Sequence, residues 1–197
     1  MHLEDRSLPR LAVIPRPRPA DPRLVEQLRR GDAEAGRRFV RDYYPGIYRY
    51  LLYLTGCRET AEDLTQETFV QAWRSLETLQ DGSRLRPWLY RIARREFLQA
   101  VRGRPPVTSL EEIAGWREPR AADETKAVEL RAILAGLPIE EREMVVLHYL
   151  EGYNSDEIAR IMGVPAGTVR YRLSEARARL RRELADPAPE DRGRKPR

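Results

Sequence analysis

The sequence predicts an all-α fold, with two small helical domains joined by a linker. Apolar residues recur at the three- and four-residue spacing of amphipathic helices over most of the chain. No segment shows the strict alternation of apolar and polar residues that is typical of a half-buried strand. Proline and glycine gather between the helical segments and near both ends. These observations place helical domains at residues 21–103 and 124–184, a linker at 104–123, and tails expected to be disordered at 1–20 and 185–197.

The composition indicates a polyanionic partner and argues against several kinds of site. The 197 residues carry a net charge of +5, and Lys126 and Lys195 are the only lysines, so nearly all positive charge is arginine. The guanidinium group suits bidentate contacts to phosphates and to guanine edges. A GC-rich genome also favours arginine codons, which explains much of the total but not its clustering. One cysteine and two histidines are too few for a zinc site or a disulfide framework, and we expect no metal, no cofactor and no catalytic residue.

The hydropathy pattern predicts neither membrane insertion nor a signal peptide. No apolar run approaches the roughly 20 residues that span a bilayer. Prolines interrupt the basic N-terminal segment, and no continuous apolar segment follows it. We therefore expect a cytoplasmic protein.

Three helices are predicted at the start of the first domain. Residues 21–22 (Asp-Pro) suit an N-cap and a first helical position, and this helix is expected to end near Gly31. Asp32 begins a second helix. The Pro-Gly pair at 45–46 predicts a break in that helix, after which residues 47–54 form an aromatic-rich apolar helix.

The helix predicted over residues 60–79 has two different faces. Thr60 and Asp63 resemble a capping box at its start. One stripe is apolar and consists of Phe69, Ala72, Trp73 and Leu76. The other is mostly polar and carries Asp63, Gln66, Glu67, Val70 and Arg74. The simplest interpretation of the polar stripe is a solvated acidic face, because catalysis would require histidines, further carboxylates or a phosphate-binding loop.

The helix predicted over residues 87–101 combines aromatic and cationic side chains. Its apolar side consists of Leu89, Ile92, Ala93, Phe97 and Val101. Arginines surround its other sides and the preceding loop, at Arg84, Arg86, Arg91, Arg94, Arg95 and Arg102. Trp88 and Tyr90 lie among these arginines. Such a surface suits single-stranded nucleic acid, because bases stack on rings while phosphates pair with guanidinium groups. The alternative, that Trp88 and Tyr90 are core residues and the arginines only aid solubility, fits the pattern equally well.

The second domain follows a segment interrupted by proline and glycine. Within that segment Leu110, Ile113 and Trp116 are apolar, so we expect it to dock on a surface. Helices are predicted at 125–137 and 139–150.

A helix-turn-helix is predicted over residues 153–180. Asn154 with Glu157 gives a capping box, Gly163 ends the first helix, and Pro165 opens the second. The buried side of the second helix is expected to consist of Val169, Leu173, Ala176 and Leu180. Its other sides carry Arg170, Arg172, Arg177, Arg179, Arg181 and Arg182. This pattern predicts a basic recognition helix for the major groove, and the alternative is an ordinary helical hairpin with a solvated charged face.

Taken in order, these segments resemble the extracytoplasmic-function sigma factors of bacterial RNA polymerase. The resemblance rests on AEDLTQETFVQAW, RPWLYRIARRE, LPIEEREMVVLHYLEGYNSDEIA and GVPAGTVRYRLSEARARLRREL, in the family's order and separations. It covers about residues 22–184 and implies two helical domains, called regions 2 and 4. It also implies a subunit that is not itself an enzyme, that binds core RNA polymerase, and that directs initiation at particular promoters.

The resemblance assigns a role to each surface. Contacts to the β′ clamp helices of the polymerase are implied for Asp63, Gln66, Glu67, Val70 and Arg74. Reading and melting of the −10 element are implied for Arg84, Arg86, Trp88, Tyr90, Arg91, Arg94 and Arg95. Duplex −35 contacts are implied for Pro165, Ala166, Thr168, Arg170, Tyr171, Arg172, Ser174 and Glu175. Region 4 would also rest on the β flap, the linker would run toward the active-site cleft, and an anti-sigma factor is an expected partner.

Several residues depart from the family pattern. Arg95 and Gln99 stand where asparagine and aspartate are common, and Tyr171, Ser174 and Glu175 also differ from the usual residues. A carboxylate near DNA repels phosphate but accepts a hydrogen bond from cytosine N4, so no promoter sequence is transferred.

Two other functions remain open. The chain could be a helix-turn-helix regulator that binds DNA without polymerase, its first domain serving for oligomerisation or sensing. It could also be a nucleic-acid enzyme with Asp63 and Glu67 as metal ligands, although this requires more convergent carboxylates than the sequence offers.

Overall fold

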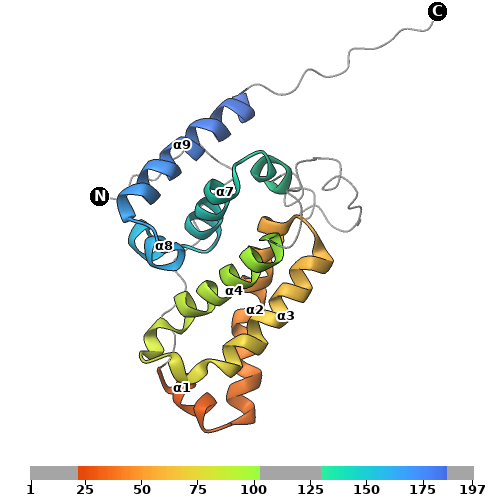
Figure 1. The fold of residues 1–197 in the computed structure, drawn as a ribbon, viewed down its shortest axis with the longest axis vertical. Coiled ribbons are helices and arrows are strands. Elements are labelled where there is room, and N and C mark those ends of the chain that lie inside the picture. Colours follow the sequence, from red (N-terminus) through yellow and green to blue (C-terminus); the bar gives the residue numbers. More distant parts are fainter. Residues whose placement is uncertain (1–21, 103–129, 186–197) are drawn as a thin grey trace, which may run out of the picture.

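The computed structural model describes residues 22–102 and 130–185, and every regular element in these ranges is helical (Figure 1). The predicted all-α class is therefore confirmed. We call residues 22–102 the front module and residues 130–185 the back module. The predicted tails, the predicted cap Asp21, and the linker with Leu110, Ile113 and Trp116 lie outside the described residues.

The front module consists of four helices and two short 3₁₀ turns. In chain order these are α1 (Pro22–Arg29), α2 (Ala33–Thr55), α3 (Arg58–Arg74), η1 (Leu76–Thr78), η2 (Gly82–Arg84) and α4 (Leu85–Arg102). The back module contains a helical segment at residues 130–135, α7 (Ile139–Val145), the π-helical turn η3 (Val146–Leu150), α8 (Ser155–Met162) and α9 (Ala166–Ala185). Figure 1 shows the back module seated on the front module, with α8 next to α4.

Helix α2 begins as predicted but does not break at Pro45. The Asp32 carboxylate accepts hydrogen bonds from the backbone N–H groups of Glu34 and Ala35, at 2.8 and 3.1 Å. The helix then continues through Pro45 to Thr55, so the predicted interruption is wrong. Pro45 is exposed, so its ring displaces no core residue and water can reach the carbonyl group that its missing N–H leaves free.

Helices α3 and α4 differ from the predictions mainly at their ends. Helix α3 begins at Arg58 with no side-chain cap, so the predicted start at Thr60 is wrong. It ends at Arg74, and a 3₁₀ turn replaces the predicted last turn. Trp73 and Val101, expected to be buried, are 49% and 46% exposed.

The helix-turn-helix agrees with its local signals. Asn154 accepts from the Glu157 N–H, and the Glu157 carboxylate accepts from the Asn154 N–H, which completes the predicted capping box. Gly163 caps α8 with φ at 72°, in the left-handed region that glycine adopts without strain. The predicted buried residues of α9 (Val169, Leu173, Ala176 and Leu180) are all buried.

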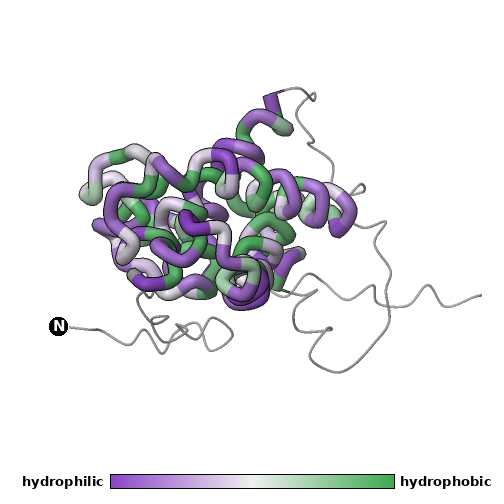
Figure 2. Tube along the Cα trace, turned by 90° about the horizontal axis from the view of Figure 1, so that it is seen from below, coloured by the Kyte–Doolittle hydropathy of each residue, from purple (hydrophilic) through white to green (hydrophobic). Residues whose placement is uncertain are grey.

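One continuous apolar core joins the two modules. The rings of Tyr50 and Tyr90 meet edge to face at 5.2 Å, and Tyr90 meets Tyr153 of the back module in the same way at 5.3 Å. Hydrophobic and hydrophilic residues alternate along the helices, as amphipathic packing requires (Figure 2). None of the described helices is long and apolar enough to cross a membrane.

Candidate nucleic-acid interface

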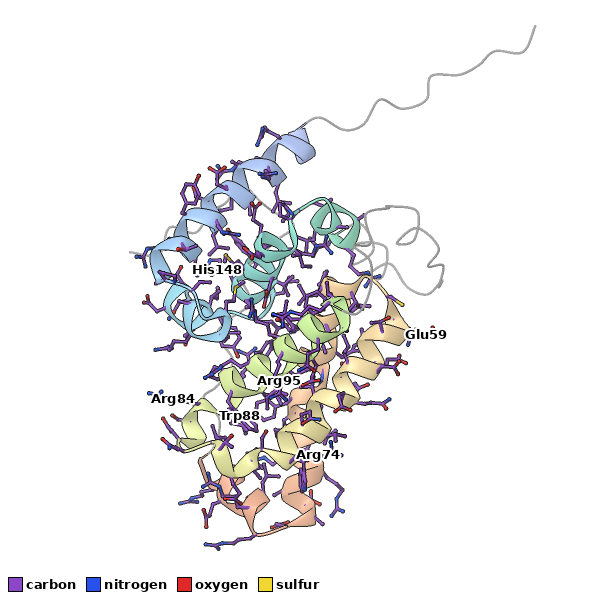
Figure 3. All side chains as sticks on the ribbon, viewed as in Figure 1. Glu59, Arg74, Arg84, Trp88, Arg95 and His148 are labelled. Atoms are coloured by element: carbon purple, nitrogen blue, oxygen red, sulfur yellow. The ribbon has the colours of Figure 1, made fainter. Side chains whose placement is uncertain are left out.

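The polar stripe of α3 lies on the surface of the front module. Asp63, Gln66, Val70 and Arg74 are exposed, and Glu67 is half-buried and accepts a 2.6 Å hydrogen bond from the Gln71 side chain. Their spacing places them on one side of the helix, which ends at Arg74 (Figure 3). The stripe is not purely acidic, because Val70 is 42% exposed and Trp73 is exposed nearby. This surface offers carboxylate, amide and apolar contacts together.

The arginine-rich helix α4 divides its predicted nucleic-acid residues between two surroundings. Arg84, Arg91 and Arg95 are exposed, and Trp88 is half-buried. Figure 3 shows Arg84, Trp88 and Arg95 following one another along this part of the chain. The remaining members of the predicted set, Arg86, Tyr90 and Arg94, face the back module, as described below.

A cavity of about 670 Å³ lies between the start of α4 and α8. Its lining includes Arg84, Trp88 and Arg91 from the front module and Arg160 and Ile161 from α8. A second hollow of about 360 Å³ continues past Arg91 and Arg160 along α4. Its lining adds Arg94, Arg95 and Arg102. An aromatic ring beside several guanidinium groups suits a stacked base and its phosphate.

Tyr90 and Arg86 are held by a buried carboxylate of the back module. The Glu151 side chain is 0% exposed and accepts hydrogen bonds from Arg86 Nη2 at 2.9 Å and from the Tyr90 hydroxyl. Arg49 of α2 donates to the same carboxylate at 2.7 and 2.9 Å. The Arg86 guanidinium also lies over the Tyr153 ring, 4.6 Å from its centroid. Burial, together with the charge of Glu151, raises the pKa of Tyr90 well above its ordinary value, so its hydroxyl stays protonated as a donor.

A second buried carboxylate, Glu143, holds Arg94. Its Oε1 lies 2.9 Å from Arg94 Nε and accepts a 2.8 Å hydrogen bond from the Tyr50 hydroxyl. Burial raises the pKa of Glu143, and the Arg94 charge opposes that rise. In addition, Arg142 of α7 donates to the carbonyl oxygen of Leu54, at the C-terminal end of α2.

These acidic residues were missed by sequence reasoning. Glu143 and Glu151 stand on either side of an apolar run, where they look like the polar ends of an amphipathic helix. One feature of the sequence does indicate burial here. The segment between the two glutamates is so apolar that no face of a helix formed by it would suit solvent. Neither carboxylate could be paired with Arg49, Arg86 or Arg94 from the sequence, because the partners are 49 to 102 residues apart.

The first turns of α9 present the predicted DNA-reading residues. Pro165, Arg170, Tyr171, Ser174 and Glu175 are exposed, and Tyr171 is 67% exposed. Ala166, Thr168 and Arg172 are half-buried, and Arg172 pairs with Glu140 of α7. Arg170 lies 3.8 Å from Asp156 at the start of α8, a surface pair that DNA phosphates can replace.

Among the described residues, no group of three or more histidine, cysteine, aspartate or glutamate side chains is arranged to hold a metal ion. Within the described residues, no third side chain of these types therefore joins Asp63 and Glu67 to form a metal site.

Comparisons with known proteins relate both modules to one family. A model for sigma-70 region 2 matches residues 39–105, and a model for sigma-70 region 4 matches residues 127–180. The extracytoplasmic-function RNA polymerase sigma factor SigE of Mycolicibacterium smegmatis is 38% identical over 155 residues, covering 74% of this chain and 60% of that protein. SigM of Bacillus subtilis, of the same family, is 34% identical over 145 residues, covering 71% of this chain and 88% of its own.

Solved structures with a similar fold are also sigma factors. CnrH, in complex with the cytosolic domain of CnrY, matches with a TM-score of 0.68 and 26% identity over 85% of this chain and 99% of its own. RpoE, in complex with the anti-sigma factor NepR from Bartonella quintana, matches with a TM-score of 0.67 and 25% identity over 79% of this chain and 100% of its own.

Proposed function

The chain belongs to the extracytoplasmic-function family of RNA polymerase sigma factors, and from this we propose that it binds core RNA polymerase in the cytoplasm and directs promoter-specific initiation without being an enzyme itself. The observation that carries the proposal is the presence, on one chain, of an exposed mixed-polarity face on α3 and a basic recognition helix, α9. A regulator that binds DNA without polymerase has no need of the first surface.

The exposed stripe of α3 is the proposed docking surface for the β′ clamp helices. Asp63 and Glu67 supply negative charge and Gln66 supplies an amide, while Val70 supplies apolar area that is costly to leave in water. Interfaces commonly combine such an apolar centre with a polar surround.

Helix α4 and the loop before it are proposed to bind the −10 element as single strands. Arg84, Arg91 and Arg95 supply exposed cations, and Trp88 supplies a ring at the edge of the cavity. Unstacked bases gain stacking energy on such a ring, which offsets part of the cost of separating the duplex.

Helix α9 is proposed to read the −35 element in the major groove. Arg170 and Tyr171 lie on its exposed side within the first turns, where a recognition helix meets base edges. Glu175 one turn later is an acceptor suited to cytosine N4. Region 4 is further proposed to rest on the β flap of the polymerase.

An anti-sigma factor is a proposed protein partner. Two sigma factors that resemble this chain in fold were solved in complexes with partner proteins, one of them named as an anti-sigma factor. We extend such a partner to this chain as part of the same proposal.

Run-off transcription tests the function directly. Purified protein is added to core polymerase on genomic fragments that include the region upstream of its own gene. Stimulated, discrete transcripts support the proposal. If no template responds, while the protein alone protects duplex DNA, the chain is a helix-turn-helix regulator instead.

A further inference from the structure

We propose that the two modules close on each other through a buried ion-pair lock that withholds part of the single-strand surface from DNA. The lock consists of Glu143 and Glu151 of the back module with Arg49, Tyr50, Arg86, Tyr90 and Arg94 of the front module. The inference rests on the proposed function for one step, the binding of DNA by α4. The closed contact itself does not depend on that function.

The lock occupies the very groups that single-stranded DNA would use. Arg86 is 17% exposed because it pairs with Glu151, and Arg94 is 22% exposed because it pairs with Glu143. Tyr90 is buried between Tyr50 and Tyr153. A base cannot reach Tyr90 until the back module moves away, and until then carboxylates hold Arg86 and also Arg94, which lines the second hollow.

The chemistry of the lock suits a contact that opens. A buried carboxylate is tolerated only while its partners satisfy it, and removal of a single partner strands the charge. Separation of the modules, by contrast, returns Glu151 and both of its arginines to water together, so no charge is stranded. The contact also has an apolar part, in which Tyr90 meets Tyr153. The lock adds to it the polar groups that distinguish interfaces that open from permanent ones.

The backbone of the back module is shaped to present Glu151. The π-helical turn η3 closes with a hydrogen bond from the Glu151 N–H to the Val146 carbonyl, at 3.1 Å. Gly152 then adopts φ of 72°, and the Tyr153 N–H donates to the Leu147 carbonyl at 2.9 Å. In an α-helix the Glu151 N–H would bond to the carbonyl four residues earlier, whereas here it bonds to the fifth. This wider turn therefore sets the direction of the Glu151 side chain.

Gly46 of α2 leaves room for the lock. A Cβ atom at this position would lie 2.9 Å from the Tyr90 hydroxyl oxygen and 3.4 Å from Glu151 Oε2. In an exposed helix, alanine is normally the better residue. An alanine here would therefore favour α2 and oppose the closed contact.

Entry of DNA would exchange partners on the same arginines. Arg84, Arg91 and Arg95 are exposed in the closed form and can meet phosphates first. Phosphates would then replace the carboxylates of Glu143 and Glu151 on Arg94 and Arg86. Helix α9 packs against α7 and α8 with Arg170 and Tyr171 outward, so the closed form still presents its duplex-reading side.

The test uses the full chain in two lock variants and one matched control. Glu151→Gln removes the charge at nearly constant shape, and Gly46→Ala disturbs the lock without any change of charge. Glu26→Gln removes a carboxylate from α1, where it pairs with Arg30 on the surface. Radius of gyration is measured by small-angle X-ray scattering, helix content by circular dichroism, and affinity with a fluorescein-labelled oligodeoxythymidine.

Both lock variants are expected to have a larger radius of gyration and to bind the oligonucleotide about tenfold or more tightly, because apparent affinity rises with the open fraction. Glu26→Gln should match the wild type.

Unchanged size and affinity in both lock variants would overturn the proposal. Weaker binding in both would also overturn it, since the groove of the closed form would then be the DNA site. Gly46→Ala decides the matter if Glu151→Gln loses helix content. Co-elution of the wild type with core polymerase separately tests the proposed function.

Discussion

At the residue scale, His148 lies half-buried in the π-helical turn that precedes Glu151. Its Nδ1 lies 2.8 Å from the carbonyl oxygen of Tyr153, and its ring meets Tyr149 edge to face. Figure 3 labels it within the back module. Burial, aided by the charge of Arg177, lowers the pKa of His148 below its ordinary value, although the Tyr153 carbonyl opposes this. The folded protein thus prefers the neutral imidazole.

The sign of the resulting pH dependence follows from proton uptake. Below the ordinary histidine pKa the unfolded chain binds a proton that the folded chain resists, so the free energy of unfolding falls as pH drops. His148 contributes at most about 1.4 kcal/mol per pH unit. We expect His148→Gln to flatten the wild-type decline between pH 7 and pH 5 in urea titrations. Parallel curves for wild type and His148→Gln would contradict the assignment.

Arg170 is the second residue whose role can be isolated. It is exposed on the first turns of α9, and its ion pair with Asp156 is long and solvated. Loss of a base-contacting arginine costs roughly 1–3 kcal/mol of discrimination. Arg170→Ala should therefore weaken the footprint of the reconstituted holoenzyme over the −35 region.

The control for Arg170 is Arg182→Ala, which removes the same charge from the far end of α9. It should lower binding only slightly, through the general attraction to phosphate. Equal losses in the two variants would show that Arg170 contributes charge alone.

At the element scale, α3 offers a test of polymerase docking. Asp63→Ala with Gln66→Ala removes a carboxylate and an amide from its exposed stripe without touching the core. We expect roughly tenfold weaker binding to core polymerase, measured by co-elution or fluorescence titration, as for two significant interface residues. Helix content should be unchanged.

The matched control lies on α1, where Glu26 and Gln27 are likewise exposed. Glu26→Ala with Gln27→Ala removes the same two chemical groups, so it should keep wild-type affinity for the polymerase. Intact binding in the α3 double variant would remove that helix from the docking surface.

The elements also show which local signals are reliable. Asn154, Glu157 and Gly163 act through atoms within a few residues, so their motif predicts the observed caps. Pro45 has an equally clear local preference, yet the helix passes through it. Phe39 before the proline and Ile47 after it are both buried. Their packing favours a continuous helix and outweighs the one hydrogen bond that Pro45 loses.

At the scale of the whole molecule, the sequence predicts two modules but not how they meet. Trp88 and Tyr90 carry identical sequence signals, since each is an aromatic ring among arginines. The structure separates them because Tyr90 faces Glu151, 61 residues away, while Trp88 lies at a cavity. Helical periodicity indicates only whether a residue lies on the apolar or the polar face of its own helix. It carries no information about which distant carboxylate completes an ion pair.

The contact between modules should be measurable as thermodynamic coupling between Arg49 and Glu151. Arg49 donates to this carboxylate across 102 residues of sequence, whereas Arg41 on the same helix pairs with its neighbour Asp42. Directly bonded residues show interaction energies of about 0.5–3 kcal/mol in double-mutant cycles. Arg49→Gln and Glu151→Gln should couple by about 1–2 kcal/mol in urea unfolding, near the middle of that range because Arg49 is partly solvated.

The same cycle with Arg41→Gln supplies the comparison, because Arg41 and Glu151 share no contact through which to interact. Its coupling energy should be close to zero. If Arg49 and Glu151 were also additive, this ion pair would not couple the two modules, and only their other contacts, such as that of Tyr90 with Tyr153, would join them. If Arg49 couples to Glu151 and Arg41 does not, the ion pair between Arg49 and Glu151 links the stability of the two modules. DNA or a protein partner that binds Arg86 in place of Glu151 would then weaken the contact between the two modules. Binding of that partner and separation of the modules would therefore be coupled equilibria.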